Sequence, residues 1–290
     1  MFHPARHLAE LARFDRPAGV WLLFWPCVWG LGLGRVLSGQ ADERFWFYAA
    51  LCFIGAVAMR SAGCIYNDWC DRRLDAAVMR TKHRPLAAGT LPVWLAVVWA
   101  AVLLLIGLSV WWHLPGTAQW AALAALPLVA LYPWMKRITY WPQAFLGLTF
   151  NWGIWVGALA IYPQFSPAML LLYLTAILWT IGYDTVYAIQ DMEYDVTVGV
   201  KSTAVRFGTA AGGLVWLCYL WQSGLLLWLG WILQLGVPYY AAILAALLLQ
   251  FWSWRRLDFA DPDSAKRGFA VNVWVGGIIA MGLLWPFGIG

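Results

Sequence analysis

Apolar residues in this chain occur in long stretches, and polar residues gather in the short segments between them. A membrane-spanning helix needs about 20 consecutive, mainly apolar residues. Nine stretches approach or meet this length, and each is predicted to be a helix. They cover residues 18–38, 45–66, 92–112, 117–134, 142–161, 166–189, 210–232, 237–254 and 270–287. The pattern therefore predicts an all-α protein, a multi-span membrane helix bundle of about nine transmembrane helices.

The composition supports a membrane protein with one domain over residues 1–290. Apolar residues make up 63% of the chain and charged residues only 11%, which is too apolar for a soluble domain. The connections are short except after the second and sixth stretches, so consecutive helices are predicted to be antiparallel neighbours. Asn151, inside an apolar stretch, is predicted to form hydrogen bonds between helices.

The positive charge is distributed very unequally between the two predicted sides of the membrane. A net charge of +5 can indicate a nucleic-acid partner, but in a membrane protein it is expected from basic cytoplasmic loops, so no nucleic acid is predicted. Only Arg35 and Arg44 fall on the side opposite the N-terminus. The N-terminus and the even-numbered connections are therefore predicted to be cytoplasmic.

Two acidic clusters lie at the ends of the second and sixth predicted helices. Each holds an Asp-x-x-x-Asp pair, Asp71 with Asp75 and Asp191 with Asp195. On a helix this spacing puts both carboxylates on one face, about 5–6 Å apart at their Cβ atoms. In both clusters a basic stretch follows, so the chain contains two repeat-like units that are predicted to face one central cavity. The clusters extend over residues 67–75 and 184–195.

Paired carboxylates of this kind suit magnesium, which takes oxygen ligands from one or two carboxylates, from water and from substrate phosphates. Two such pairs predict two Mg²⁺ ions bridged by a diphosphate, with basic side chains meeting the remaining charge. An alternative is that the acids only pair with arginines on solvated loops; two clusters with the same spacing favour the metal site. The candidate basic residues are Arg16, Arg72, Arg73, Arg80, Lys82, Arg84, Arg137 and Lys201.

The motifs resemble those of the UbiA superfamily of intramembrane prenyltransferases, and most closely its bacterial 4-hydroxybenzoate polyprenyltransferase branch. The matching segments are Asn67-Asp68-x-x-Asp71-x-x-x-Asp75, Arg80-Thr81-x-x-Arg84-Pro85, Tyr183-Asp184-Thr185-x-Tyr187 followed by Asp191-x-x-x-Asp195, and the opening Arg13-x-Asp15-Arg16-Pro17-x-Gly19. The resemblance extends over essentially the whole chain. It implies nine helices around a water-excluding cavity.

The resemblance also implies roles for individual residues. Tyr183 and Asp184 match positions near an aromatic acceptor, and Asp184 is expected to orient or deprotonate it. Arg137 and, less directly, Arg16 match positions that contact the diphosphate. The expected catalytic residues are Asp184, Arg137, Asp71 and Asp191. The expected metal ligands are Asn67, Asp71 and Asp75 for one Mg²⁺ ion and Asp191 and Asp195 for the other.

Arg60 lies inside the second predicted helix, where a charged side chain usually has a function. It is expected either to bind the carboxylate of the acceptor or to pair with Asp184. Further diphosphate contacts are expected from Arg72, Arg80, Arg84 and Lys201.

The function implied by the resemblance is transfer of a polyprenyl group from polyprenyl diphosphate to carbon 3 of 4-hydroxybenzoate, with release of diphosphate, in ubiquinone biosynthesis. Such an enzyme is expected in the cell inner membrane among its lipids, with cytoplasmic active-site loops and no obligatory protein partner. Alternatives are another acceptor, such as homogentisate, a naphthoate or haem, or a transporter without covalent chemistry. The sequence leaves the prenyl chain length and the oligomeric state open.

Overall fold

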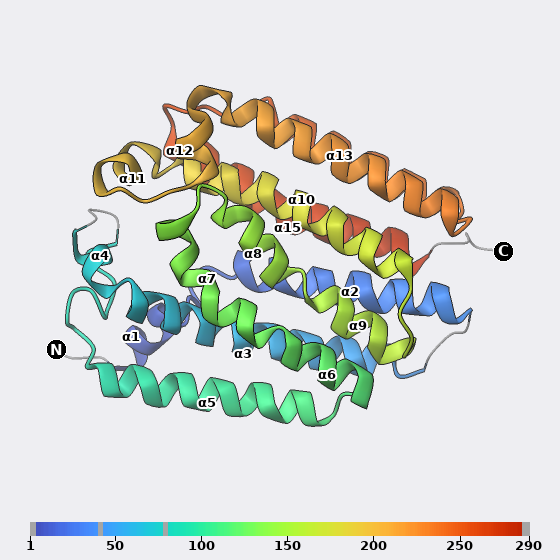
Figure 1. The fold of residues 1–290 in the computed structure, drawn as a ribbon, viewed down its shortest axis with the longest axis horizontal. Helices are drawn as coiled ribbons and strands as arrows, with labels where there is room; N and C mark the ends of the chain where they lie inside the picture. The colour runs from blue at the N-terminus through green and yellow to red at the C-terminus, as the bar shows by residue number, and fades with distance from the viewer. Residues whose placement is uncertain (1–3, 40–42, 78–80, 286–290) are drawn as a thin grey trace.

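The computed structural model describes residues 4–39, 43–77 and 81–285, and in this part of the chain the protein is helical without strands (Figure 1). Nine helical segments within these ranges are long and apolar enough to cross a membrane, which confirms the predicted fold class. They are α2 (Ala18–Ser38), α3 (Phe45–Cys70), α5 (Val93–Trp112), α6 with α7 (Gly116–Ala124, Leu126–Ile138), α8 with α9 (Pro142–Phe150, Gly153–Ile161), α10 (Pro167–Ile189), α13 (Ala211–Ile232), α14 (Val237–Trp254) and α15 (Pro262–Leu284).

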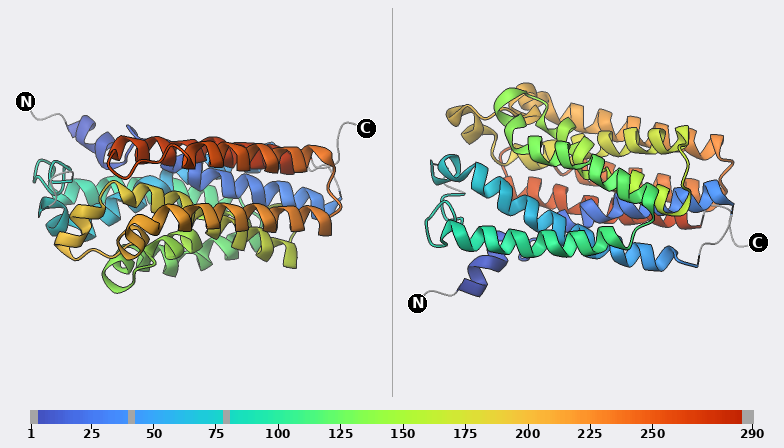
Figure 2. Two further views of the ribbon diagram at one scale, coloured as in Figure 1. Left: turned by 90° about the horizontal axis from the view of Figure 1, so that it is seen from above. Right: turned by 60° about the horizontal axis from the view of Figure 1, so that its bottom comes forward.

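The long helices run along one common axis, and the short helices gather at one end of the bundle (Figure 2). At this end lie α1 (Pro4–Leu11), α4 (Arg72–Ala77), α11 (Met192–Val198) and α12 (Thr203–Phe207), the last followed by a short 3₁₀ turn (Gly208–Ala210). The C-terminal end of α15 lies at the opposite end of the bundle. The chain is a multi-pass membrane protein, and both acidic clusters belong to the end that carries α4 and α11.

Three predicted helices, α3, α7 and α15, extend four or more residues further than predicted, in each case into a polar segment. The helix α3 continues to Cys70, so Asn67 and Asp68 are helical rather than part of a loop. The helix α15 begins at Pro262 instead of residue 270, since Asp261 caps it by accepting a hydrogen bond from the Asp263 amide (2.9 Å). The last two predicted positions of that span, 286–287, lie outside the described residues.

The fourth and fifth predicted spans are each divided into two helices. The fourth is interrupted at Ala125, just before Pro127, whose ring nitrogen cannot donate a helical hydrogen bond. The fifth is interrupted at Asn151, whose side-chain amide donates to Ala176 O (3.0 Å) and Thr180 Oγ1 (2.7 Å) on α10. The predicted role of Asn151 as a hydrogen-bond partner between helices is therefore confirmed.

The close packing of α2 against α9 depends on glycine. A Cβ atom at Gly30 would run into Ile154 O and lie 2.9 Å from Ala158 N, both backbone atoms of α9. Since backbone cannot move aside as a flexible side chain does, we expect Gly30→Ala to destabilise the protein by about 1–3 kcal/mol or more. Thermal unfolding in detergent measures this. Gly224→Ala, with nothing within 4 Å of the added methyl group, is the matched control, and equal melting temperatures for the two variants would contradict the interpretation.

Candidate active site

The two aspartate pairs each span one helical turn, as their spacing predicts. The Asp75 amide donates to Asp71 O (2.8 Å), and the Asp195 amide donates to Asp191 O (2.8 Å). The two clusters also come into contact, because the Tyr194 hydroxyl on α11 donates a hydrogen bond to the carbonyl oxygen of Ala77 on α4. Segments more than a hundred residues apart in sequence thus meet at one end of the bundle (Figure 1).

A network of ion pairs organises the first cluster. Asp68 is 1% exposed and accepts hydrogen bonds from Arg13 Nη2 at both oxygens (2.9 and 2.8 Å). Arg84 Nη1 donates to Asp68 (3.0 Å) and to Asp75 (2.8 Å), so one guanidinium joins two carboxylates. Burial lowers the pKa of Arg13, and the Asp68 carboxylate opposes this shift. The N-terminal segment is thereby fixed to the end of α3.

Asp71 is fully buried and has two basic partners from the last turn of α7. Lys136 Nζ donates to one carboxylate oxygen, and Arg137 Nη2 donates to the other (3.1 Å) and to Cys70 O (3.1 Å). Lys201, which follows the second cluster, donates from its amide to Lys136 O (2.9 Å). The sequence analysis missed Lys136 and Asp68 as members of the site, although Asp68 lies within the acidic motif and Lys136 adjoins Arg137.

The oxygen-rich end of α3 and α4 fits the requirements of a hard divalent cation. Asp68, Asp71 and Asp75 are at most 5% exposed, and their charge is balanced by basic side chains. Buried carboxylates need such compensation, and a dication supplies it equally well. Among the described residues no group of three or more His, Cys, Asp or Glu side chains is close enough to hold one ion. Mg²⁺ is usually held by one or two carboxylates, with substrate phosphates and water completing its shell.

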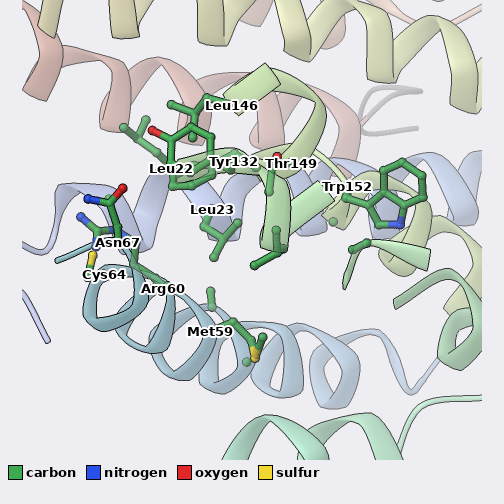
Figure 3. A pocket seen from close by; sticks show the side chains of 18 of the residues that line it. Leu22, Leu23, Met59, Arg60, Cys64, Asn67, Tyr132, Leu146, Thr149 and Trp152 are labelled. Carbon is green, nitrogen blue, oxygen red and sulfur yellow. The ribbon is translucent and has the colours of Figure 1, made fainter. Parts of the chain in front are cut away.

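We call the end of α3 and α4 that holds Asp68, Asp71 and Asp75 with their basic partners the ionic end. A cavity of about 980 Å³ leads from this ionic end into the bundle. Figure 3 shows Asn67 and Arg60 toward one end of the cavity and Trp152 at the other, with Leu23 and Met59 between them. The apolar arm also receives Leu104, Leu108 and Leu126 from α5 and α7. At the end away from Asn67, the Trp152 side chain is held in place because its indole N–H donates to the Ala121 carbonyl oxygen (2.7 Å) (Figure 3). The cavity thus combines a charged entrance with an apolar channel.

Two of the charged side chains that line the cavity, Arg60 and Asp184, have no hydrogen-bond or ion-pair partner among the described residues. Arg60 Nε and Nη1 are buried, and no described residue accepts a hydrogen bond from them. No described residue donates a hydrogen bond to Asp184, and no Arg60–Asp184 ion pair is present among the described residues. Of the two alternatives for Arg60, pairing with Asp184 is therefore wrong for the described structure. Tyr183, beside Asp184, is buried and accepts a hydrogen bond from Thr180 Oγ1 (3.2 Å). Arg60 and Asp184 are therefore available to a ligand.

The other predicted residues are distributed around the entrance. Arg16, Asn67 and Arg84 line the cavity, and Arg16 forms an ion pair with Asp15 (3.2 Å). Arg72 and Arg73 are exposed and do not line the cavity, and Arg80 lies outside the described residues. The remaining ones do not line the cavity and belong to segments at the end of the bundle that carries α4 and α11 (Figure 1): Asp71, Asp75, Arg137, Asp191, Asp195 and Lys201.

The sequence has clear relatives. The pattern of the UbiA prenyltransferase family matches residues 23–276. A mitochondrial 4-hydroxybenzoate polyprenyltransferase of Arabidopsis thaliana is 41% identical over 282 residues, covering 96% of this chain and 68% of that protein. A 4-hydroxybenzoate octaprenyltransferase of Cupriavidus metallidurans is 38% identical over 283 residues, covering 97% of this chain and 94% of that protein.

Solved structures share the fold. A UbiA homologue from Aeropyrum pernix K1, solved in its apo form, is similar with a TM-score of 0.76 and 24% identity, covering 91% of this chain and 96% of that one. A UbiA homologue from Archaeoglobus fulgidus bound to GPP and Mg²⁺ is similar with a TM-score of 0.65 and 18% identity, covering 94% of this chain and 99% of that one.

Proposed function

Since this chain belongs to the UbiA prenyltransferase family, we propose that it transfers a polyprenyl group from polyprenyl diphosphate to carbon 3 of 4-hydroxybenzoate and releases diphosphate, as a step of ubiquinone biosynthesis. The observation that carries the proposal is that one cavity combines an ionic entrance with an apolar arm. A lipid diphosphate has the same two-part character. Its charged head fits the entrance and its isoprenoid tail fits the channel.

The ionic end binds the diphosphate. Arg16 and Arg84 line the entrance, while Lys136, Arg137 and Lys201 adjoin it through Asp71 and the carbonyl oxygens of α7. Two Mg²⁺ ions are proposed, one held by Asn67, Asp71 and Asp75 and the other by Asp191 and Asp195. The ions, when bound, supply positive charge to the departing diphosphate. The basic side chains stabilise the same developing charge from fixed positions.

The acceptor binds between Arg60 and Asp184. The guanidinium of Arg60 takes the carboxylate of 4-hydroxybenzoate, because its buried nitrogens have no protein acceptor. Asp184 accepts the hydrogen bond of the phenol hydroxyl and takes up its proton, which raises the electron density on the ortho carbon. The bond between the first prenyl carbon and the diphosphate oxygen breaks, and the allylic cation that results bonds to carbon 3. The carbon 3 proton then passes to the released diphosphate while Asp184 returns its proton to the phenol oxygen, which restores the aromatic ring.

The apolar walls protect the reaction from water. An allylic cation that forms as diphosphate leaves would react with water, and the channel walls formed by Leu23, Met59 and Leu126 exclude it. We further propose that the protein lies in the cell inner membrane, with the end that carries α4 and α11 in the cytoplasm. The support is the concentration of Lys and Arg in the segments at that end.

Purified protein incubated with geranyl diphosphate, radiolabelled 4-hydroxybenzoate and Mg²⁺ tests the proposal. We expect a prenylated product that is lost with EDTA and restored by excess Mg²⁺. Homogentisate and 1,4-dihydroxy-2-naphthoate in place of 4-hydroxybenzoate are the acceptor controls and should give little product. A product that forms equally well with EDTA, or preference for another acceptor, would contradict the proposal.

A further inference from the structure

Gly19 lies in the first turn of α2, is buried, and lines the cavity next to Arg60. A Cβ atom at this position would collide with Arg60 Nε and lie 2.8 Å from Nη2 and 2.9 Å from Cζ. All three atoms belong to the guanidinium. The guanidinium therefore rests directly on the backbone of α2 at Gly19, which has no side chain.

The described residues give Arg60 neither a hydrogen-bond acceptor at Nε and Nη1 nor an ion-pair partner. Both nitrogen atoms are buried. The partly buried Arg13 and Arg84 differ from Arg60, since carboxylates hold both of them in place. Packing against Gly19, and not hydrogen bonding, thus decides where this guanidinium lies.

We propose that Gly19 is the positioning residue for Arg60 and so determines the selectivity of the site for an acceptor that carries a carboxylate. The inference rests on the proposed function, because it assumes that Arg60 binds the acceptor. Gly19 itself need not touch the substrate. It leaves the space in which the guanidinium faces the cavity, and a methyl group there would move the guanidinium away.

Gly19→Ala is a suitable test because the crowded atoms are the far end of a flexible side chain. Arg60 can swing aside without a backbone shift, and alanine is a better helix former than glycine. We therefore expect the melting temperature to be unchanged or higher. Gly213→Ala is the matched control, since Gly213 also lies in the first turn of a long helix, α13, with nothing within 4 Å and away from the cavity.

Steady-state kinetics distinguish a role of Gly19 in positioning Arg60 from a general loss of structure. We expect Gly19→Ala to raise KM for 4-hydroxybenzoate by about ten- to a hundredfold, the range for losing a hydrogen bond to a charged group. The KM for geranyl diphosphate should stay within about twofold of wild type, because its head binds at the ionic end. The preference for 4-hydroxybenzoate over 4-hydroxybenzamide should fall by a similar factor, and in an Arg60→Ala background Gly19→Ala should have no further effect.

The possible results test the proposed function and the positioning role of Gly19 separately. If wild-type protein prenylates no 4-hydroxybenzoate, the proposed function fails. If wild type is active but Gly19→Ala keeps wild-type KM and acceptor preference, the positioning role is wrong. A lowered melting temperature, equal loss for both substrates, or an additive effect with Arg60→Ala would also overturn it, since each indicates a structural role for Gly19.

Discussion

Asp71→Asn lowers the rate of prenyl transfer by about 10²–10³-fold or more, the size expected when one fixed electrostatic contact to a leaving group is lost. Asp71 is fully buried and is contacted by Lys136 and Arg137, and it is a proposed magnesium ligand. Asparagine keeps the shape but removes the charge. Rates measured with saturating Mg²⁺ and geranyl diphosphate give the effect.

The fold should survive this change. Lys136 and Arg137 keep 25% and 41% of their side chains exposed, so both reach water when the Asp71 charge is removed. Size-exclusion profiles and melting temperatures check this. Asp263→Asn, on the exposed start of α15, is the control and should keep wild-type activity. Asp191→Asn should lose activity to a similar degree, because the two clusters form one site; wild-type rates in either Asp71→Asn or Asp191→Asn would contradict the two-metal arrangement.

The second large effect is expected at Asp184, which lines the cavity without a hydrogen-bond donor from the described residues. Asp184→Asn should lower kcat by about 10²–10⁴-fold, the usual contribution of a general base. Asparagine can still orient a phenol hydroxyl but cannot take its proton. Single-turnover rates of product formation measure the chemical step directly.

The affinity for the prenyl substrate is the internal control for Asp184. Binding of geranyl diphosphate, measured without acceptor, should be unchanged because its head lies among the basic residues of the ionic end. Asp184→Glu should recover part of the activity, since it restores the carboxylate. An unchanged kcat in Asp184→Asn, or an equal loss of geranyl diphosphate affinity, would show that Asp184 does not have the assigned role.

Much of the fold could be predicted from the sequence because bilayer thickness imposes a minimum length on each apolar stretch. All nine spans were located in this way. The interruptions at Ala125 and Asn151 were not, because hydropathy does not register a missing or redirected backbone hydrogen bond. The early start of α15 was also missed, since Asp263 and its charged neighbours lower the hydropathy of a segment that is nevertheless helical.

The sequence predicts those features of the site that depend on residues close together in the chain. Local spacing fixes the helical turn between Asp71 and Asp75, because it involves neighbouring residues only. Which cation meets which carboxylate depends on segments far apart in the chain, such as Arg13 with Asp68 and the Lys136 contact to Asp71. Neither pairing has a sequence signal beyond the presence of the residues. That Arg60 Nε and Nη1 lack a hydrogen-bond acceptor among the described residues likewise depends on the helices around them and could not be predicted from the sequence.

The central claim is that one cavity joins a diphosphate site to an acceptor site, and the structure of the reaction product tests it most directly. Purified wild-type protein with Mg²⁺, geranyl diphosphate and ring-labelled 4-hydroxybenzoate should give 3-geranyl-4-hydroxybenzoate, identified by NMR, with one inorganic diphosphate released per product. A geranyl ether on the phenol oxygen, substitution at another carbon, or diphosphate release without any prenylated acceptor would contradict the account.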